Sequence, residues 1–331
     1  MPTHEAPPEE PAHDEGFAAA PASWYHLCTE LDLRKGPVSL SIPLTQSFVG
    51  FMTQSGSPVV LSSRCSHMGV DLALGRVRGE HLACPLHGWE YGSDGRCGRI
   101  PAGGDIPDFA RQASFPVELR GGNVFFFNRP KARFPLPFFD GLEASQMISA
   151  PGFEFTVQAP WYLVGANGFD LQHFRSAHDR TLIGDPVVDT PDSFAWRVRA
   201  RFRVTGSSVF DFITRTVSGS EVEMSVTNWC GNFVLVEARF RRTTTYGLVS
   251  FVPLGPNLTR LRDLVWIRRR RNPLARAFLD RVDVRIRSRF IREFVKSDVE
   301  SSNGLRFDRR RMIGADNTLV AYLDWLRLVQ H

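Results

Sequence analysis

The sequence has no long hydrophobic run, and this absence excludes an integral membrane protein built from helices. The strand-like segment 122–128 is far shorter than the roughly 18 to 20 apolar residues that cross a bilayer. No charged segment followed by an apolar one opens the chain, so we expect no secretion signal and a cytoplasmic protein. Of the 331 residues, 43% are hydrophobic and 23% charged, a composition typical of globular proteins.

Lysine is nearly absent, because Lys35, Lys131 and Lys296 are the only three among 40 basic residues. The formal net charge is +5, although residues 1–20 contain five acids and no basic residue. Positive charge can bind nucleic acid, but no nucleic-acid motif accompanies it, so we expect no such partner. An acidic protein is the better candidate. Glycine-rich nucleotide-binding motifs are also missing, so we expect no nucleotide site.

Cysteine is scarce as well. The chain has five cysteines, an odd number, at positions 28, 65, 84, 97 and 230. Without a secretion signal this number argues against a disulfide framework and makes metal binding the leading interpretation. Cys97 and Cys230 have no neighbouring motif, and we expect them to be inert buried thiols.

The chain changes character twice, which predicts a tail and two domains. Residues 1–21 hold five prolines and five acids, and we predict a disordered acidic tail there. Residues 22–137 contain short apolar runs separated by glycine and polar turns, which indicates an all-β domain ending in a proline-rich linker. Residues 138–331 predict an antiparallel sheet covered by helices. The fold class is therefore α+β.

Within the second domain, the pattern predicts a helix over 162–182 and a run of longer strands over 195–267. Segment 208–218, SVFDFITRTVS, is one of these expected strands. A long helix is expected from about residue 274 to about 299, and a final helix over about 317–329.

Four residues in two short motifs have the spacing of metal ligands. They are Cys65, His67, Cys84 and His87, in the pattern C-x-H-x16-C-x2-H. Zinc binds two thiolates and two imidazoles in a tetrahedron, whereas a Rieske [2Fe–2S] cluster has two cysteines on one iron and two histidines on the other. Each motif here supplies one residue of each type, so two facing loops give each iron one ligand per loop. Zinc fingers usually have two cysteines in one short motif and two histidines in the other, so the spacing favours the [2Fe–2S] cluster.

The two loops resemble those of Rieske proteins, in CSHMGVDLALG (65–75) and CPLHGWEY (84–91). High-potential Rieske proteins have two further cysteines, in the places that Val70 and Leu86 occupy here. The resemblance therefore points to a small Rieske ferredoxin or to the oxygenase component of a Rieske non-haem iron oxygenase. A ferredoxin would end near residue 130, so the remaining 200 residues or so favour the oxygenase. Trp89 either shields the cluster from water or packs in the core.

A second motif, N-x2-D-x2-H-x4-H, follows in the second domain with Asn167, Asp170, His173 and His178. Two histidines and one carboxylate leave open positions on Fe(II) for O2 chemistry. The pattern alone arises by chance in polar helices. Downstream of a Rieske motif it is similar to the mononuclear iron motif of Rieske oxygenases, particularly of single-subunit monooxygenases. Asn167 is a possible supporting residue.

The spacing of these residues limits how they can act. His173 and His178 stand about 140° apart on a regular helix, so they can share one iron only if the helix is distorted or ends between them. Asp170 and His173 are three residues apart and share a face. Asp170 is therefore better placed to orient His173 than to bind the same iron.

The resemblance implies a third iron ligand, an aspartate on a long helix near the C-terminus. Asp298, in segment 290–300, occupies that context, and Glu300, Asp283 and Glu293 are its rivals. This segment and the closing ADNTLVAYLDWL also look like the branch of steroid 9α-hydroxylases and cholesterol desaturases.

The resemblance implies an activity as well. A separate flavin-containing reductase, with or without a ferredoxin, takes electrons from NAD(P)H. The Rieske cluster passes these electrons to Fe(II). The Fe(II) then uses O2 to hydroxylate, desaturate or demethylate an apolar ring-containing substrate. It also implies a head-to-tail homotrimer in which Asp170 bridges His173 and His87 of the adjacent subunit. Two alternatives remain open at this point, a non-catalytic Rieske electron carrier and a structural zinc-binding protein.

Overall fold

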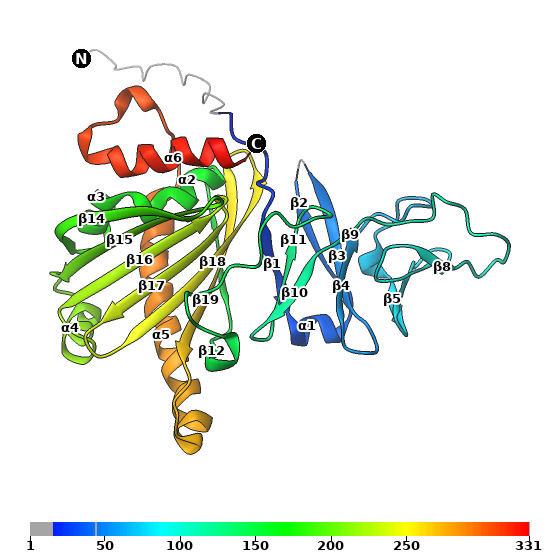
Figure 1. Cartoon of the computed structure of the whole chain (residues 1–331), viewed down its shortest axis with the longest axis horizontal. Coiled ribbons are helices and arrows are strands. Elements are labelled where there is room, and N and C mark those ends of the chain that lie inside the picture. Colours follow the sequence, from blue (N-terminus) through cyan, green and yellow to red (C-terminus); the bar gives the residue numbers. More distant parts are fainter. Residues whose placement is uncertain (1–15, 44, 331) are drawn as a thin grey trace, which may run out of the picture.

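The computed structural model describes residues 16–43 and 45–330 (Figure 1). Most of the predicted tail, residues 1–15, therefore lies outside the described residues. Its last residues are packed rather than disordered, because Phe17 stacks on Tyr162 with ring centroids 4.1 Å apart and Trp161 donates its indole N–H to the carbonyl of Ala18 at 3.1 Å. The disorder prediction was wrong for these residues, because aromatic burial holds them on the second domain.

Strands in the described part of the first domain form three small antiparallel sheets, in the orders β1-β11-β10, β2-β3-β4-β9 and β5-β6-β7-β8. The elements are β1 (Trp24–Thr29), α1 (Glu30–Lys35), β2 (Val38–Ile42), β3 (Gln46–Met52), β4 (Pro58–Ser62), β5 (Arg76–Arg78), β6 (His81–Ala83), β7 (Glu90–Tyr91), β8 (Cys97–Arg99), β9 (Ser114–Phe115), β10 (Val117–Arg120) and β11 (Asn123–Phe127). Gly121 and Gly122 join β10 to β11 with φ of 57° and 78°, as a two-residue hairpin requires. The sheet of β5 to β8 lies at the end farthest from the second domain (Figure 1).

A large antiparallel sheet forms the second domain, and in the described residues it has eight strands. They are β12 (Met147–Ser149), β13 (Phe153–Val157), β14 (Arg180–Asp192), β15 (Ala195–Val204), β16 (Glu221–Trp229), β17 (Phe233–Phe240), β18 (Thr244–Gly255) and β19 (Leu258–Arg268). The order is β12-β19-β18-β17-β16-β15-β14, and β13 also pairs with β19. This sheet confirms the predicted α+β class.

Helices cover the sheet on one face and along one side. They are α2 (Trp161–Ala166), α3 (Leu171–His178), α4 (Val209–Val217), α5 (Pro273–Ser302) and α6 (Asn317–Val329), with 3₁₀ turns at Leu72–Leu74, Ala144–Gln146, Asn167–Phe169, Arg309–Arg311 and Gly314–Asp316. Figure 1 shows α5 running behind the sheet, with α2, α3 and α6 along its upper side. In the described part of the chain, none of the helices combines the length and the apolar character that a membrane crossing needs.

Segment 208–218 is a helix, α4, and not the predicted strand. Its alternating β-branched and aromatic residues favour a strand, but the Ser208 hydroxyl accepts a hydrogen bond from the Asp211 amide at 3.1 Å. A serine three residues before an acid is a helix-start signal, and here it overrides β-propensity.

The helix predicted over 162–182 ends early. It is divided into α2, a 3₁₀ turn and α3, and α3 stops at His178 because Asp179 has a left-handed φ of 52°. The strand that follows, β14, was missed because it contains Pro186 and Pro191. Proline is tolerated there because β14 is an edge strand and pairs only with β15.

Candidate metal centres

The two predicted cluster loops have the same backbone geometry. Cys65 follows β4 and Cys84 follows β6, and the carbonyl of each accepts a hydrogen bond from the glycine amide four residues later, at 2.7 Å from Gly69 and 3.0 Å from Gly88. Both glycines have positive φ, 72° and 70°, a conformation that other residues rarely adopt. Two matching turns thus present one cysteine and one histidine each.

The four predicted ligands lie together at these loops. The Nδ1 atoms of His67 and His87 face each other at 3.1 Å on exposed rings, whereas Cys65 and Cys84 are 3% and 4% exposed. Burial raises the pKa of the Cys84 thiol, and the backbone amides of Leu86 and His87 oppose this by donating to its sulfur. Two inner sulfurs and two outer imidazole nitrogens fit a [2Fe–2S] cluster held by two loops.

Aromatic residues support the loops. Trp89 is 7% exposed, packs in the core of the first domain and stacks on His67 with ring centroids 4.5 Å apart and planes within 4°. The Tyr91 hydroxyl lies 3.1 Å from the Cys65 sulfur and 3.0 Å from the Ser66 hydroxyl. The sequence reading assigned Tyr91 no role, and the only signal was its position at the end of the second loop motif.

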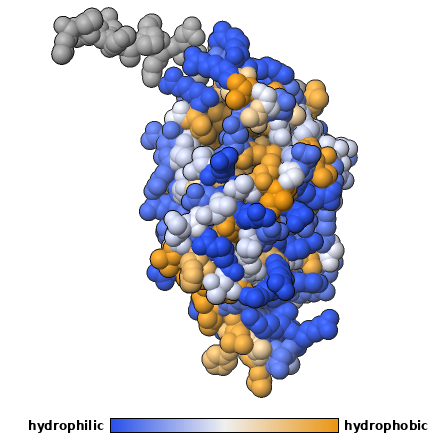
Figure 2. All heavy atoms as spheres, turned by 90° about the vertical axis from the view of Figure 1, so that its left-hand side faces the viewer, coloured by the Kyte–Doolittle hydropathy of each residue, from blue (hydrophilic) through white to orange (hydrophobic). Residues whose placement is uncertain are grey.

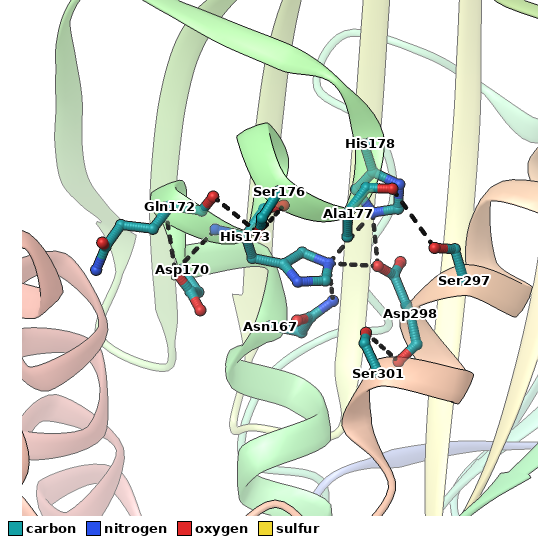
Figure 3. Close-up of polar contacts among 10 residues, drawn as sticks. All are labelled: Asn167, Asp170, Gln172, His173, Ser176, Ala177, His178, Ser297, Asp298 and Ser301. Atoms are coloured by element: carbon teal, nitrogen blue, oxygen red, sulfur yellow. Dashed lines mark hydrogen bonds and ion pairs between the residues drawn. The ribbon is translucent and has the colours of Figure 1, made fainter. Parts of the chain in front are cut away.

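A second group of three side chains converges in the other domain. Nε2 of His173 and Nε2 of His178 each lie 2.6 Å from Oδ1 of Asp298, and the two nitrogens are 3.2 Å apart (Figure 3). The histidines come from α3 and Asp298 comes from α5, 120 residues later. Three donor atoms pointing at one place are a candidate metal site. The structure thus joins the three residues that the sequence proposed.

The ends of α3 explain how two histidines five residues apart can meet. Asp170 caps the start of the helix, with Oδ1 accepting from the backbone amides of Gln172 and His173 at 3.1 Å each. His178 is the last helical residue. The helix therefore ends directly after His178, where Asp179 has a left-handed conformation, and not between the two histidines as the sequence analysis allowed.

Charge couples the three donor groups. Burial lowers the pKa of His173, but the hydrogen bond and the negative charge of Asp298 outweigh this and leave it raised. Burial raises the pKa of Asp298, but the hydrogen bonds from His173 and His178 leave it lowered. Phe294 stacks on His178 with centroids 3.5 Å apart. Two imidazole nitrogens and one carboxylate oxygen, close together in a partly apolar pocket, are suitable ligands for a divalent metal ion.

The remaining predicted residues lie nearby in different roles. The Asn167 amide is 3.5 Å from Nε2 of His173. Asp170 contacts the His173 backbone, so the expected contact with its imidazole is not the one that the structure shows. Among the rivals of Asp298, Glu300 pairs with Lys296 at 3.7 Å and is exposed, and Asp283 pairs with arginines.

A cavity of about 1000 Å³ opens beside the histidines and Asp298. It lies between α5, α4 and one face of the sheet, and its walls are mostly valine, phenylalanine and isoleucine. The phenylalanines that line it are Phe174, Phe210, Phe240, Phe251, Phe290 and Phe294. Leu279, Val282 and Ile286 of α5 line it and are also more than half exposed, so they mark its mouth.

Comparison with known proteins identifies the first domain. Residues 23–110 match the family described as "Rieske [2Fe-2S] domain". The N-terminal domain is a Rieske domain. The Rieske loops described above, with Cys65, His67, Cys84 and His87, lie within this match.

Relatives of the chain are oxygenase components and a desaturase. It is 30% identical over 180 residues to "Cholesterol 7-desaturase nvd 1" of Ciona intestinalis, a match covering 53% of this chain and 38% of the relative. It is 39% identical over 83 residues to "3-ketosteroid-9-alpha-monooxygenase, oxygenase component" of Rhodococcus rhodochrous, covering 25% and 22%. The aligned parts thus span less than half of the length of these curated relatives.

The similarity to solved structures covers both domains of the chain. The structure of NdmA from Pseudomonas putida CBB5 with caffeine has a TM-score of 0.70 and 20% identity, covering 93% of this chain and 90% of that one. Dicamba monooxygenase bound to dicamba gives a TM-score of 0.65 at 18% identity, covering 93% and 97%. The chain therefore has the Rieske oxygenase fold.

Proposed function

We propose that this chain is the terminal oxygenase component of a Rieske non-haem iron oxygenase, most simply a monooxygenase. The observation that carries the proposal is the convergence of His173, His178 and Asp298 beside an apolar cavity, downstream of a Rieske domain. Neither an electron carrier nor a zinc protein needs a second donor group of this kind or the cavity next to it.

His173, His178 and Asp298 would hold a mononuclear Fe(II). When bound there, Fe(II) supplies the reductive activation of O2 that inserts oxygen into a C–H bond or removes hydrogens from it. The chain's own contribution is to fix three donor atoms, with Asn167 beside His173 and Phe294 packed on His178. The apolar wall keeps water away and holds the organic substrate next to these donors.

Cys65, Cys84, His67 and His87 would hold the [2Fe–2S] cluster, which accepts and donates single electrons. Electrons would come from NAD(P)H through a separate reductase, with or without a ferredoxin. The chain's contribution is a tight, hydrogen-bonded set of loops in which Tyr91 contacts the Cys65 sulfur. The exposed His67 and His87 place the cluster edge at the surface, where another protein can approach.

We propose that another subunit of the same chain covers this edge in a head-to-tail homotrimer. Within one chain, the Rieske loops and α3 lie toward opposite ends of the molecule (Figure 1), and electron transfer requires short distances. Met68 and Leu86 are 66% and 53% exposed beside the exposed histidines, which suits an interface. Asp170 uses Oδ1 for the α3 amides. Its other oxygen would accept a hydrogen bond from His87 of the adjacent subunit.

The substrate we propose is an apolar molecule that contains rings. The cavity walls are largely hydrophobic, and relatives are named for steroid hydroxylation and cholesterol desaturation, so these reactions and demethylation are the candidates. All five cysteines, which lie in the described part of the chain, are free thiols. Free thiols suit a reducing compartment, and we propose the cytoplasm.

A comparison of two neighbouring acids on α5 tests the proposal. Asp298→Ala should abolish O2-dependent product formation, because it removes a donor atom, and should leave the Rieske absorbance unchanged. Glu300→Ala is the matched control, because Glu300 is exposed and makes only a weak pair with Lys296. Loss of turnover in Glu300→Ala with full activity in Asp298→Ala would show that the wrong carboxylate was chosen.

A further inference from the structure

One buried acid, Asp263, lies on the wall of the cavity that the sheet forms. Asp263, on β19, is 2% exposed and lines the cavity. Its Oδ1 is buried and has no hydrogen-bond partner among the described residues. A buried carboxyl group without a hydrogen-bond partner destabilises the fold, because its desolvation is not compensated. Such a group in a cavity therefore points to a bound ligand that supplies the missing hydrogen bond.

The surroundings of Asp263 are apolar. On the same face of the sheet, Val249 is directly opposite on β18, and Leu261 is two residues away on β19. Gly247, also on this face, has no side chain, and a Cβ there would lie 3.8 Å from Oδ1 of Asp263. The glycine therefore leaves room above the carboxyl group.

No cation offsets this acid. Burial alone raises the pKa of Asp263 to about 7, and no charge of the described residues contributes. By contrast Asp211, another buried acid of the cavity wall, has its carboxylate held by Arg180 at 2.7 Å. The Asp263 carboxyl therefore keeps its proton in about half of the molecules at pH 7 and in most of them at lower pH, and a protonated carboxyl donates one hydrogen bond and accepts others.

Asp263 lies well away from the metal-binding donors but in the same cavity. Phe174 of α3 stacks on Phe202 of β15 and shares a hydrophobic cluster with Val222 of β16, so the metal site lies over these two strands. Asp263 is on β19, three strands beyond β16 across the sheet. At about 4.8 Å between neighbouring strands, the separation is roughly 14 Å. A molecule that touches both places must be elongated.

We propose that Asp263 hydrogen-bonds an uncharged oxygen group, a ketone or hydroxyl, at the far end of an elongated apolar substrate whose reacting carbon lies beside His173 and His178. The proposal rests on the proposed function and adds the anchor that sets the position of the substrate. The ketone or hydroxyl supplies the partner that Oδ1 lacks, and the hydrophobic walls cover the rest of the molecule. The distance between anchor and metal site then selects which carbon reacts.

Equilibrium binding to the whole protein tests this, with two ligands that differ in one oxygen. The ligands are a tetracyclic 3-ketosteroid and the same steroid with a methylene in place of the 3-ketone. Wild-type protein should bind the ketone about 10- to 100-fold more tightly than the deoxy compound. Asp263→Leu should lose this preference without weakening the deoxy compound. Asp263→Asn should keep most of it, because a carboxamide also donates and accepts hydrogen bonds.

Each other outcome has a clear meaning. If wild-type protein binds neither steroid, or binds both equally, the proposal is wrong. If Asp263→Asn loses the ketone preference as fully as Asp263→Leu, the preference does not come from a hydrogen bond that this side chain donates, and the proposal is wrong. Binding as predicted without any O2-dependent turnover would instead contradict the proposed function and leave the anchor standing.

Discussion

Replacement of Asp263 by asparagine should make the protein more stable at neutral and alkaline pH. The exchange keeps the size of the side chain and its polar character, and it removes the ability to ionise. In the folded chain burial moves the pKa of Asp263 from 3.8 to about 7. Between these values the unfolded chain has released this proton and the folded chain still holds it, so wild-type stability falls as pH rises.

The size of the effect follows from the same pKa values. A tenfold change in a proton-binding constant corresponds to about 1.4 kcal/mol. Asp263→Asn should therefore exceed wild type in unfolding free energy by about 2 kcal/mol at pH 5 and by about 4 kcal/mol at pH 8. Above about pH 8 the difference should stay constant, because both states of the wild type are then ionised.

Urea denaturation followed by tryptophan fluorescence, at several pH values from 5 to 8, measures this difference. Asp211→Asn is a suitable contrast, because the pKa of Asp211 is lowered by hydrogen bonds from Ser208 and Arg180 that outweigh its burial. That variant should be less stable than wild type near neutral pH. A stability difference for Asp263→Asn that is absent, or that does not grow with pH, would refute the description of Asp263 as an unpartnered buried acid.

Three further predictions concern the two metal centres. Cys84→Ser should remove the visible absorbance of the cluster and its sulfide, and an unchanged spectrum would exclude Cys84 as a ligand. Tyr91→Phe should lower the reduction potential of the cluster, measured by redox titration, because it removes the hydroxyl beside the Cys65 sulfur; an unchanged potential would contradict that contact. Asp170→Asn should load both centres and reduce normally but lose most product formation, and normal turnover would exclude Asp170 as the bridge between subunits.

The sequence predicted most residues of the two candidate centres because these residues lie in short local motifs. Cys65 to His67 and Cys84 to His87 each occupy one turn, so spacing alone described the loops. Asp298 needed the resemblance as well, because it meets His173 only after the chain has crossed the whole sheet.

Other features depended on contacts that a sequence pattern does not contain. Segment 208–218 has strand propensity, and its helix depends on the cap provided by Ser208. Asp263 lies on β19 and on the same face of the sheet as Leu261, and the sequence analysis assigned it no role. The structure shows that Oδ1 of Asp263 has no hydrogen-bond partner among the described residues, and this depends on every residue around it.

The iron and acid-labile sulfide content of anaerobically purified protein tests the central claim most directly. The account predicts red-brown protein with about three irons and two sulfides per wild-type chain, and about two irons and two sulfides in His178→Ala. The variant should keep the Rieske absorbance and lose turnover, because only the second centre is affected. Stoichiometric zinc without visible absorbance would contradict the account, and so would an iron content that is the same in both proteins.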